Sequence, residues 1–361
     1  MPARTLLTRL NELCNVDVDD ADYDFISSLP LKPYNQTSNQ VVITEAMTLP
    51  RNQSIFQDCL REYGSEGWGT VYEKVTVRIC AKNASLISGR LLVQTSPEHL
   101  HNRDEIINQC RRFAESFAQE GLSKDRFAIK LPFTGAAACA AQQLNAEGIK
   151  TLATSVFCLE QAIAASQSQC LLISPYFEEI AAHTDLSQRP QVKDTALEHP
   201  MSPRIIHMLE AFTTLYKQTG QEQPIMVIAS HFHSEQLMAM AELGCQHITI
   251  SQDNLRRLMS TQDDLPPVTQ AKPSHPYAGL STPERLRSLS KLDPLAKADW
   301  DGILASLDVD YLEDNGAKLD QAIKQDSVSG KRIHDAMERF VKAEQRAKNL
   351  IEAETNKIAY V

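Results

Sequence analysis

The sequence lacks several features that mark common classes of protein. None of its eight cysteines forms a CxxC pair, so neither a disulfide framework nor a zinc ribbon is expected. No apolar run approaches the ~20 residues that a membrane-spanning helix requires. The first residues, MPARTLLTRLNEL, contain neither a long apolar segment nor a small-residue cleavage site. We therefore expect a cytoplasmic protein with reduced cysteines and no membrane partner.

Positive charge and phosphate-binding loops are also scarce. The formal net charge of -10 argues against a nucleic-acid or anionic-membrane partner, because both are polyanions that need lysine and arginine. Neither a glycine-rich phosphate loop nor a GxSxG motif is present, so the sequence indicates neither nucleotide use nor a serine hydrolase. We expect no cofactor.

The chain does contain a repeated alternation of two kinds of segment. Eight short apolar runs rich in β-branched residues are separated by longer stretches with helical spacing, as in βα units around a parallel sheet. The runs are LCNVDVD ending at Asp19, KPYNQTSN ending at Asn39, GRLLVQTS from Gly89, RFAIKLP around Lys130, KTLATSVF from Lys150, CLLISPY from Cys170, PIMVIASHF from Pro224 and QHITIS ending at Ser251. Eight such units predict an α/β fold of the (β/α)8 TIM-barrel type.

The barrel does not account for the whole chain. We assign residues 1–260 to the barrel and 261–300 to a proline-rich excursion over or beside it, which could cover the barrel mouth. Residues 301–361 are assigned to C-terminal helices, because apolar side chains from Ile333 to Ile351 fall on one face of a long charged helix. That face packs on the barrel or on a second subunit, so a homodimer is possible.

Polar residues end the predicted strands, where a TIM barrel carries its chemistry. They are Asp19, Thr37, Asn39, Gln94, Lys130, Thr154, Ser174 and Ser230. Lys130 is the most informative, because an ammonium group inside FAIKLP must be paired, desolvated or deprotonated. Burial can lower a lysine pKa by ~3–5 units, which leaves a neutral amine able to form a Schiff base with a carbonyl. The alternative is a lysine that extends from the strand end into water.

The order of these motifs resembles the transaldolase family. DRFAIKL, EGIK, FCLEQA and LLISPY are similar to the central block of that family, and NVDVDDAD with KPYNQTSN is similar to its first two strands. GRLLVQTS resembles the third strand, VIAS the seventh and ITIS the eighth, so the resemblance runs from about Leu10 to Leu258. It implies a class I enzyme in which Lys130 forms an imine with a ketose and Asp19 is the general acid/base.

The resemblance also implies roles for other strand-end residues. Asn39 and Ser174 would bind substrate hydroxyls, and Thr154 would hold the catalytic water. To the substrate-binding set we add Thr37, Ser230, Glu179, Phe232, His231 and His233. The alignment leaves one choice open, because Asp17 lies two residues before Asp19 on the same face of the strand.

Two departures from the family pattern concern the catalytic water. Gln94 stands where transaldolases carry a catalytic Glu, and Tyr176 stands where they have Phe. Both changes are similar to the fructose-6-phosphate aldolase branch, in which a Gln and a Tyr hold the water. Because Gln cannot take a proton, Asp19 and the Tyr176 hydroxyl must share the proton transfers, which favours an aldolase-like cycle.

Other departures concern the substrate phosphate, which the family binds with two arginines. Glu179 stands in place of the first and Phe232 in place of the second, and Leu152 replaces a family Asn. A carboxylate repels a phosphate dianion, so we expect a non-phosphorylated or otherwise atypical substrate. His231 and His233 flank Phe232; they could bind a metal as an HxH pair, line the pocket or lie in solvent. No third metal ligand is evident, so we predict no metal site.

We therefore predict a transaldolase-like lysine Schiff-base enzyme that makes or breaks a carbon–carbon bond in a small carbonyl or polyol substrate. Lys130, Asp19, Gln94, Thr154 and Tyr176 are its predicted catalytic set. Two alternatives stay open: an imine- or aldol-condensation enzyme of specialised metabolism, and a catalytically reduced barrel that serves as a binding or scaffold protein.

Overall fold

The computed structural model describes residues 4–268 and 272–359. Its strands are β1 (Asn15–Asp19), β2 (Gln36–Thr37), β3 (Leu91–Gln94), β4 (Phe127–Pro132), β5 (Thr151–Val156), β6 (Leu172–Pro175), β7 (Ile225–Ile228) and β8 (His247–Ser251). The strands pair in parallel and in chain order, and β1 pairs with β8 to close the sheet. Each predicted run contains one strand, which confirms the (β/α)8 TIM barrel.

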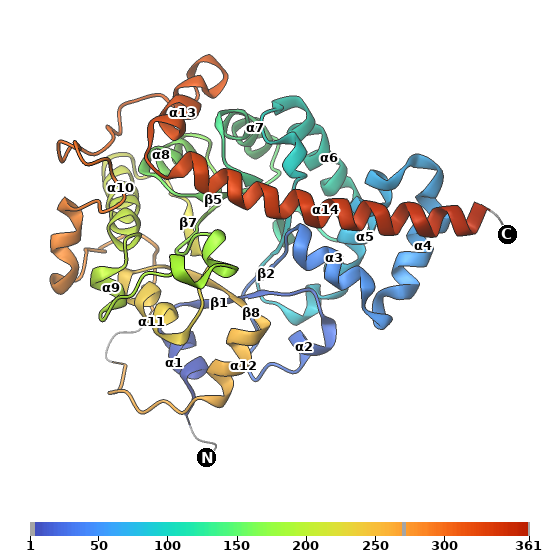
Figure 1. Cartoon of the computed structure of the whole chain (residues 1–361), viewed down its shortest axis with the longest axis horizontal. Helices are drawn as coiled ribbons and strands as arrows, with labels where there is room; N and C mark the ends of the chain where they lie inside the picture. The colour runs from blue at the N-terminus through green and yellow to red at the C-terminus, as the bar shows by residue number, and fades with distance from the viewer. Residues whose placement is uncertain (1–3, 269–271, 360–361) are drawn as a thin grey trace.

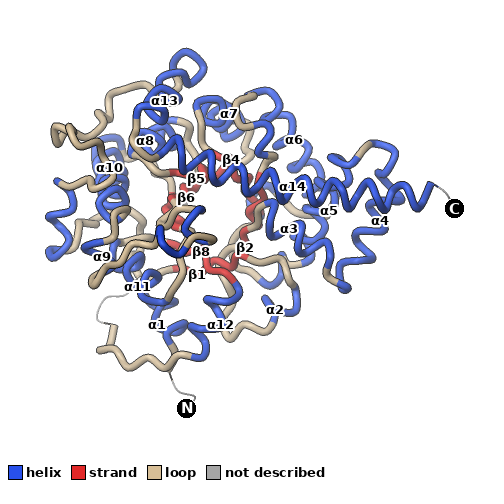
Figure 2. Tube along the Cα trace, viewed as in Figure 1, coloured by secondary structure: helices blue, strands red, loops and turns tan. Residues whose placement is uncertain are grey.

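Helices enclose this ring of strands (Figure 2). They are α1 (Leu6–Leu13), α2 (Tyr23–Ser27), α3 (Gln40–Thr48), α4 (Gln53–Tyr63), α5 (Trp68–Lys82), α6 (Arg103–Gln119), α7 (Gly135–Ala146), α8 (Leu159–Gln167), α9 (Thr195–Glu198), α10 (Ser202–Thr219), α11 (Ser234–Leu243), α12 (Gln252–Ser260), α13 (Glu313–Gln325) and α14 (Ser329–Ala359). Most of the apolar core lies between the strands and these helices. None of the helices in the described part of the chain has the length and apolar character to cross a membrane.

A separate apolar layer fills the inside of the barrel. It consists of Leu92, Ala128, Leu152, Leu172 and Val227. Because alternate residues of a strand point the same way, three of these side chains lie one step below the polar ends of β3, β4 and β6. The apolar layer therefore closes the barrel beneath the predicted site.

The proline-rich excursion lies beside the barrel, and its first part, residues 272–277, contacts the end opposite the mouth. Lys272 Nζ donates to Asn15 Oδ1 at 3.1 Å, and Gln246 Nε2 donates to the Pro276 carbonyl at 3.1 Å. The Tyr277 hydroxyl donates to the Pro224 carbonyl. Asn15 begins β1, Gln246 directly precedes β8 and Pro224 directly precedes β7, so these contacts gather at the N-terminal ends of the strands.

The helix α14 crosses the C-terminal ends of the strands instead (Figure 1). It packs on α3 and α5 and contacts β5. Its apolar face, which includes Ile333, Met337 and Phe340, is buried. The predicted apolar stripe of this helix thus packs on the chain's own barrel.

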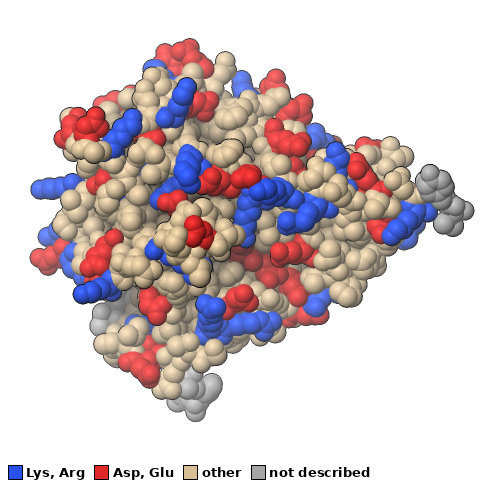
Figure 3. Space-filling view, in the orientation of Figure 1, with Lys and Arg blue, Asp and Glu red and all other residues tan. Residues whose placement is uncertain are grey.

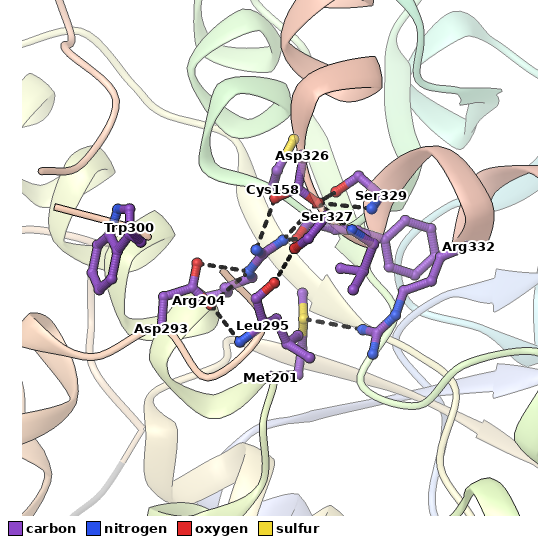
Figure 4. A network of polar contacts seen from close by, with 12 residues as sticks. Cys158, Met201, Arg204, Asp293, Leu295, Trp300, Asp326, Ser327, Ser329 and Arg332 are labelled. Carbon is purple, nitrogen blue, oxygen red and sulfur yellow. Dashed lines mark hydrogen bonds and ion pairs between the residues drawn. The ribbon is translucent and has the colours of Figure 1, made fainter. Parts of the chain in front are cut away.

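A buried arginine holds the beginning of α14 in place (Figure 4). Arg204 of α10 is 3% exposed, and its Nη2 donates to Asp326 Oδ2 at 2.8 Å. Its Nε donates to Asp293 Oδ1 at 3.0 Å, and its Nη1 donates to the Phe157 carbonyl at 2.9 Å. Asp326 in turn accepts the backbone N–H of Ser329, the first residue of α14, at 2.7 Å. This network joins the C-terminal segment to the barrel.

Surface charge is mixed on the face that α14 crosses. Lysine and arginine side chains alternate there with aspartate and glutamate, and neither sign covers a broad area of this face (Figure 3). Local pairing within the mouth, more than the net charge of -10, therefore determines the electrostatics around the site.

Candidate active site

Lys130 lies inside the barrel near the end of β4. Its side chain is 6% exposed, and its Nζ donates to Thr37 Oγ1 of β2 at 2.9 Å. Leu152, 1% exposed, lies directly opposite on β5 and adds apolar surroundings. Burial lowers the pKa of Lys130 to about 8, and the negative charge of Asp19 opposes part of that shift. A substantial fraction of this lysine is therefore neutral near physiological pH.

Asp19 ends β1 directly opposite Thr37 of β2, so Thr37 lies between Asp19 and the lysine that it contacts. Burial raises the pKa of Asp19, while the positive charges of Lys130 and then Arg339 lower it. Among the described residues, no side chain or backbone group hydrogen-bonds its buried Oδ1. Asp19 therefore combines a perturbed pKa with a free acceptor oxygen beside the lysine.

Asp17 has a different environment one step deeper in the barrel. It is fully buried and accepts the backbone N–H of Asn35 at 3.0 Å and the Asn35 amide at 2.8 Å. His247 Nδ1 lies 3.0 Å from its Oδ1. Both carboxylate oxygens are thus engaged inside the protein, so the geometry favours Asp19 as the acid/base.

Gln94 lies next to Lys130, as its register partner on β3. Its side chain is 4% exposed, and its Nε2 donates to Gln40 Oε1 at 2.7 Å. The Oε1 of Gln94 is buried and is not hydrogen-bonded to any residue that the structure describes. An amide oxygen in this position can accept a hydrogen bond from a water or from a substrate hydroxyl.

Thr154 and Tyr176 contact each other near the C-terminal ends of β5 and β6. The Thr154 hydroxyl donates to the Tyr176 hydroxyl at 3.3 Å, both side chains are buried, and burial raises the pKa of Tyr176. Ser174 is the register partner of Thr154. The register shifts between Thr154 and Val156, and the intervening Ser155 has φ 56, a left-handed conformation that is uncommon outside glycine. Such strain is found most often at functional sites.

Two of the predicted substrate-binding residues also have structural roles. Asn39 is the N-cap of α3, and its Oδ1 accepts the backbone N–H of Val41 at 2.9 Å, so only its NH2 group is left for a ligand. Ser230 has φ 64, and its hydroxyl donates to the Glu178 carbonyl at 2.9 Å. His183 Nε2 also lies 2.9 Å from that hydroxyl.

The structure does not bring His231 and His233 together as a pair. Both ring nitrogens of His231 are engaged, one 2.9 Å from the Thr249 carbonyl and the other 3.1 Å from the Asn254 amide. His233 is exposed at the N-cap of α11. In residues 4–268 and 272–359, no group of three His, Cys, Asp or Glu side chains is placed to hold a metal ion. The HxH metal alternative and the pocket-lining role of these histidines therefore gain no support.

Phe232 and Glu179 are covered by arginines that the sequence analysis did not include. The Arg189 guanidinium lies 3.8 Å from the centre of the Phe232 ring. Glu179 accepts a hydrogen bond at 2.6 Å from Arg332 of α14, whose side chain is 5% exposed. The Glu179 carboxylate is thus paired within the chain.

Several residues around the mouth could not be selected from sequence alone. Gln40, His183, Arg332, Arg339 and Glu344 have no motif of their own, and three of them belong to α14. In the sequence, these three are charged residues of an amphipathic helix. They can be selected as functional positions only when the helix is known to cross the mouth.

Comparison with known proteins agrees with this geometry. A model of the Transaldolase/Fructose-6-phosphate aldolase family matches residues 16–301. The transaldolase of Xanthomonas euvesicatoria pv. vesicatoria is 30% identical over 268 residues, which are 72% of this chain and 80% of that protein. The transaldolase of Sus scrofa is 28% identical over 278 residues, 74% of this chain and 78% of that protein. The chain therefore belongs to the transaldolase/fructose-6-phosphate aldolase family of enzymes.

Proposed function

We propose that the chain makes or breaks a carbon–carbon bond through a Schiff base on Lys130. The observation that carries this proposal is a buried lysine with a pKa of about 8 close to Asp19, whose acceptor oxygen has no partner in the described part of the chain. A neutral amine can add to a ketone carbonyl, and loss of water then leaves an iminium. The barrel positions nucleophile and base on different strands of one rigid scaffold.

Asp19 is the general acid/base of the proposed cycle. It takes the proton from the hydroxyl on the carbon β to the iminium carbon, the bond between the α and β carbons breaks, and its electrons neutralise the iminium as an enamine. The β carbon leaves as an aldehyde. The enamine then either attacks a second aldehyde or is protonated, after which water hydrolyses the imine and releases Lys130.

Gln94, Thr154 and Tyr176 hold the water in this proposal. The amide oxygen of Gln94 is an acceptor that cannot take a proton, and the hydroxyls of Thr154 and Tyr176 contact each other. Proton transfers therefore depend on Asp19 and on the Tyr176 hydroxyl. This arrangement favours the branch in which water ends the cycle, which is aldolase chemistry rather than transfer.

We further propose a non-phosphorylated carbonyl substrate, bound by Thr37, Asn39 and Ser174. The support is the pair of Glu179 and Arg332, because a phosphate would have to compete with the Glu179 carboxylate for this buried guanidinium. Phe232 offers no donor at the second position.

Arg339 provides the sharpest check on this substrate. It is an exposed residue of α14 whose positive charge acts on Asp19, Tyr176 and His183. Turnover of fructose and of fructose 6-phosphate should be compared side by side in the wild type and in Arg339→Gln. A clear preference of the wild type for the phosphorylated sugar would overturn the proposed substrate, and its loss in Arg339→Gln would identify Arg339 as the residue responsible.

Borohydride trapping tests the proposed reaction. Reduction in the presence of dihydroxyacetone should leave a stable adduct on the peptide that contains Lys130, detectable by mass spectrometry. Absence of an adduct with every carbonyl donor would instead favour the scaffold alternative. A cytosolic location and a homodimer stay predictions, to be tested by fractionation and by light scattering.

A further inference from the structure

A chain of polar side chains leads from the active site to α14. The amide of Gln94 donates to Gln40 Oε1, and Gln40 Nε2 donates to the backbone carbonyl of Thr95 at 2.8 Å. The next residue, Ser96, donates its hydroxyl to Glu344 Oε2 of α14 at 2.8 Å. All of these side chains are buried: Gln40 is 1% exposed, Glu344 3% and Gln94 4%.

The chemistry of the groups determines which way each amide faces. The Thr95 carbonyl can only accept, so Gln40 must present its NH2 group to it. Gln40 therefore presents its oxygen to Gln94, and Gln94 must present its own NH2 group to that oxygen. The oxygen of Gln94 is left facing away from Gln40. The acceptor-only backbone carbonyl of Thr95 therefore fixes the orientation of both amides.

The amide oxygen of Gln94 ends the series of hydrogen bonds on the active-site side. Gln94 Oε1 is buried, and no described residue donates to it. Gln94 and Lys130 are directly opposite each other on β3 and β4, so their side chains lie on the same side of the sheet, inside the barrel. A buried acceptor with no donor costs free energy, which is recovered when a water or a substrate hydroxyl binds to it.

Glu344 of α14 ends this series of hydrogen bonds and holds Ser96 in place. Burial raises the pKa of Glu344 to about 7, and the negative charges of Glu98 and Glu73 add to that rise. Its hydrogen bond with Ser96 and the nearby side chain of Gln40 lower the pKa in part. Tyr72 of α5 is a buried neighbour of Glu344. Burial, and then the negative charge of Glu344, raises the pKa of Tyr72. Thr44 of α3 donates to the carbonyl of Ala343 at 3.0 Å and fixes α14 at the same level.

We propose that Gln40, braced by Glu344, is a positioning residue that keeps the Gln94 amide oxygen turned toward the reacting atoms at Lys130. This inference rests on the proposed Schiff-base function and deepens it. Gln40 does not touch the substrate. The oxygen of Gln40 accepts from the NH2 group of Gln94. If the Gln94 amide were flipped, its oxygen would face the Gln40 oxygen and its NH2 group would face the water, so the flipped orientation is unfavourable.

The first test removes the amide and then replaces it conservatively. Gln40→Met should lower kcat about ten- to a hundredfold with little change in KM, as expected for misplacement of a group near the reacting atoms. Gln40→Glu should retain activity at low pH, because a protonated carboxyl can still donate to the Thr95 carbonyl and accept from Gln94. Its activity relative to wild type should fall as pH rises and that carboxyl ionises beside Glu344.

Thr44→Val is the matched control. It removes the Thr44 hydroxyl, which contacts the backbone carbonyls of Ala343 in α14 and of Gln40 in α3, and leaves both side-chain amides in place. It therefore reports the effect of looser helix packing around Gln40 without loss of the Gln40 amide. Its kcat should stay close to wild type. Equal losses in Thr44→Val and Gln40→Met, or a Gln40→Glu variant whose pH profile parallels the wild type, would overturn the positioning role.

A second test replaces the Gln94 amide with a group that cannot donate to the Gln40 oxygen. Gln94→Glu places a carboxylate oxygen against the oxygen of Gln40, so this single variant should lose activity about tenfold or more. Adding Gln40→Met to Gln94→Glu removes the opposed oxygen and should recover part of that loss. Additive losses in the double variant would contradict the proposal.

Failure of this inference is distinguishable from failure of the proposed function. If the wild type gives no borohydride adduct on Lys130, the Schiff-base function fails. If the wild type gives the adduct and turns over substrate, and Gln40→Met does the same at the wild-type rate, the positioning role of Gln40 alone fails.

Discussion

The two halves of the barrel mouth use their polar groups differently. In the half formed by β1–β5, buried oxygens of Asp19 and Gln94 have no partner among the described residues, and the Lys130 ammonium group donates to Thr37. In the half formed by β6–β8 and their loops, the buried or partly buried carboxylates of Glu178 and Glu179 are paired within the chain. Glu179 pairs with Arg332, and Gln236 donates to Glu178.

This difference separates chemistry from substrate binding. Polar groups without protein partners in a buried site are costly, and they persist where a ligand or a reaction needs them. Groups that are paired internally add to the stability of the loops but have little capacity left for a ligand. We infer that the first half of the mouth carries out the reaction, while the second half has lost the usual means of binding a phosphate.

The largest expected effect comes from removing the nucleophile in the first half. Lys130→Met should abolish turnover and borohydride trapping, because no other group in that position can form the imine. The fold should persist, since the side-chain volumes are similar and a buried amine is removed. Circular dichroism and a thermal melt provide the control. A variant that unfolds would show that the lysine is structural.

Substitution of the two aspartates of β1 should affect different properties, catalysis for Asp19 and stability for Asp17. Asp19→Asn should lower kcat about 10²–10⁴-fold, as expected for loss of a general acid/base, and leave the melting temperature nearly unchanged. Asp17→Asn should instead cost about 1–3 kcal/mol of stability, because the carboxylate satisfies Asn35 and faces His247 inside the barrel. If the two results are reversed, Asp17 is the acid/base.

The pKa of Lys130 predicts how the reaction depends on pH. Imine formation needs the neutral amine, so its rate should rise with pH and level off above about 8, the lowered pKa of this lysine. Stability should change in the same direction. Because the folded pKa lies below the ordinary 10.5, the unfolded chain binds more protons between about 8 and 10.5, and stability rises with pH there.

Lys130→Met should not show that rise in stability, which provides the control. Rates of adduct formation measured by quenching with borohydride at several pH values test the kinetic part. A rate that stays flat from pH 6 to 9 would mean that the amine has no such lowered pKa.

The smallest expected effect comes from restoring a cation to the second half. Glu179→Arg removes the carboxylate that pairs with Arg332 and adds a second guanidinium. It should raise kcat/KM for fructose 6-phosphate relative to fructose about tenfold, which corresponds to roughly one charge-assisted hydrogen bond. Glu179→Gln, which only removes the repulsion, should give a smaller change. An unchanged ratio in both variants would show that Glu179 does not control phosphate binding.

The fold was largely predictable because each strand of a parallel barrel is buried on both faces and reads as a short β-branched run. Even β2, which is two residues long, lies within its predicted run. The division of the chain at residues 260 and 300 stays a prediction. The location of the two appended segments was less predictable, since proline content does not specify which end of the barrel a loop contacts.

The active site was predictable where strand order brings residues together. Thr37 and Lys130 are far apart in sequence but meet at 2.9 Å, because the ends of parallel strands share one edge. The choice between Asp17 and Asp19 stays a prediction, because alternation places both on the inner face; their different hydrogen-bond partners could not be predicted from sequence. The α14 residues Arg332 and Glu344 were beyond prediction, because their roles depend on where a helix docks.

The central claim is that catalysis is retained in one half of the mouth while phosphate binding is lost in the other. Its most direct test is borohydride reduction with fructose as the only donor and, separately, with fructose 6-phosphate, followed by mass spectrometry of the Lys130 peptide. We expect an adduct on Lys130 that forms with fructose at least as fast as with its phosphate. An adduct that forms only with the phosphorylated sugar, or on another lysine, would contradict the claim.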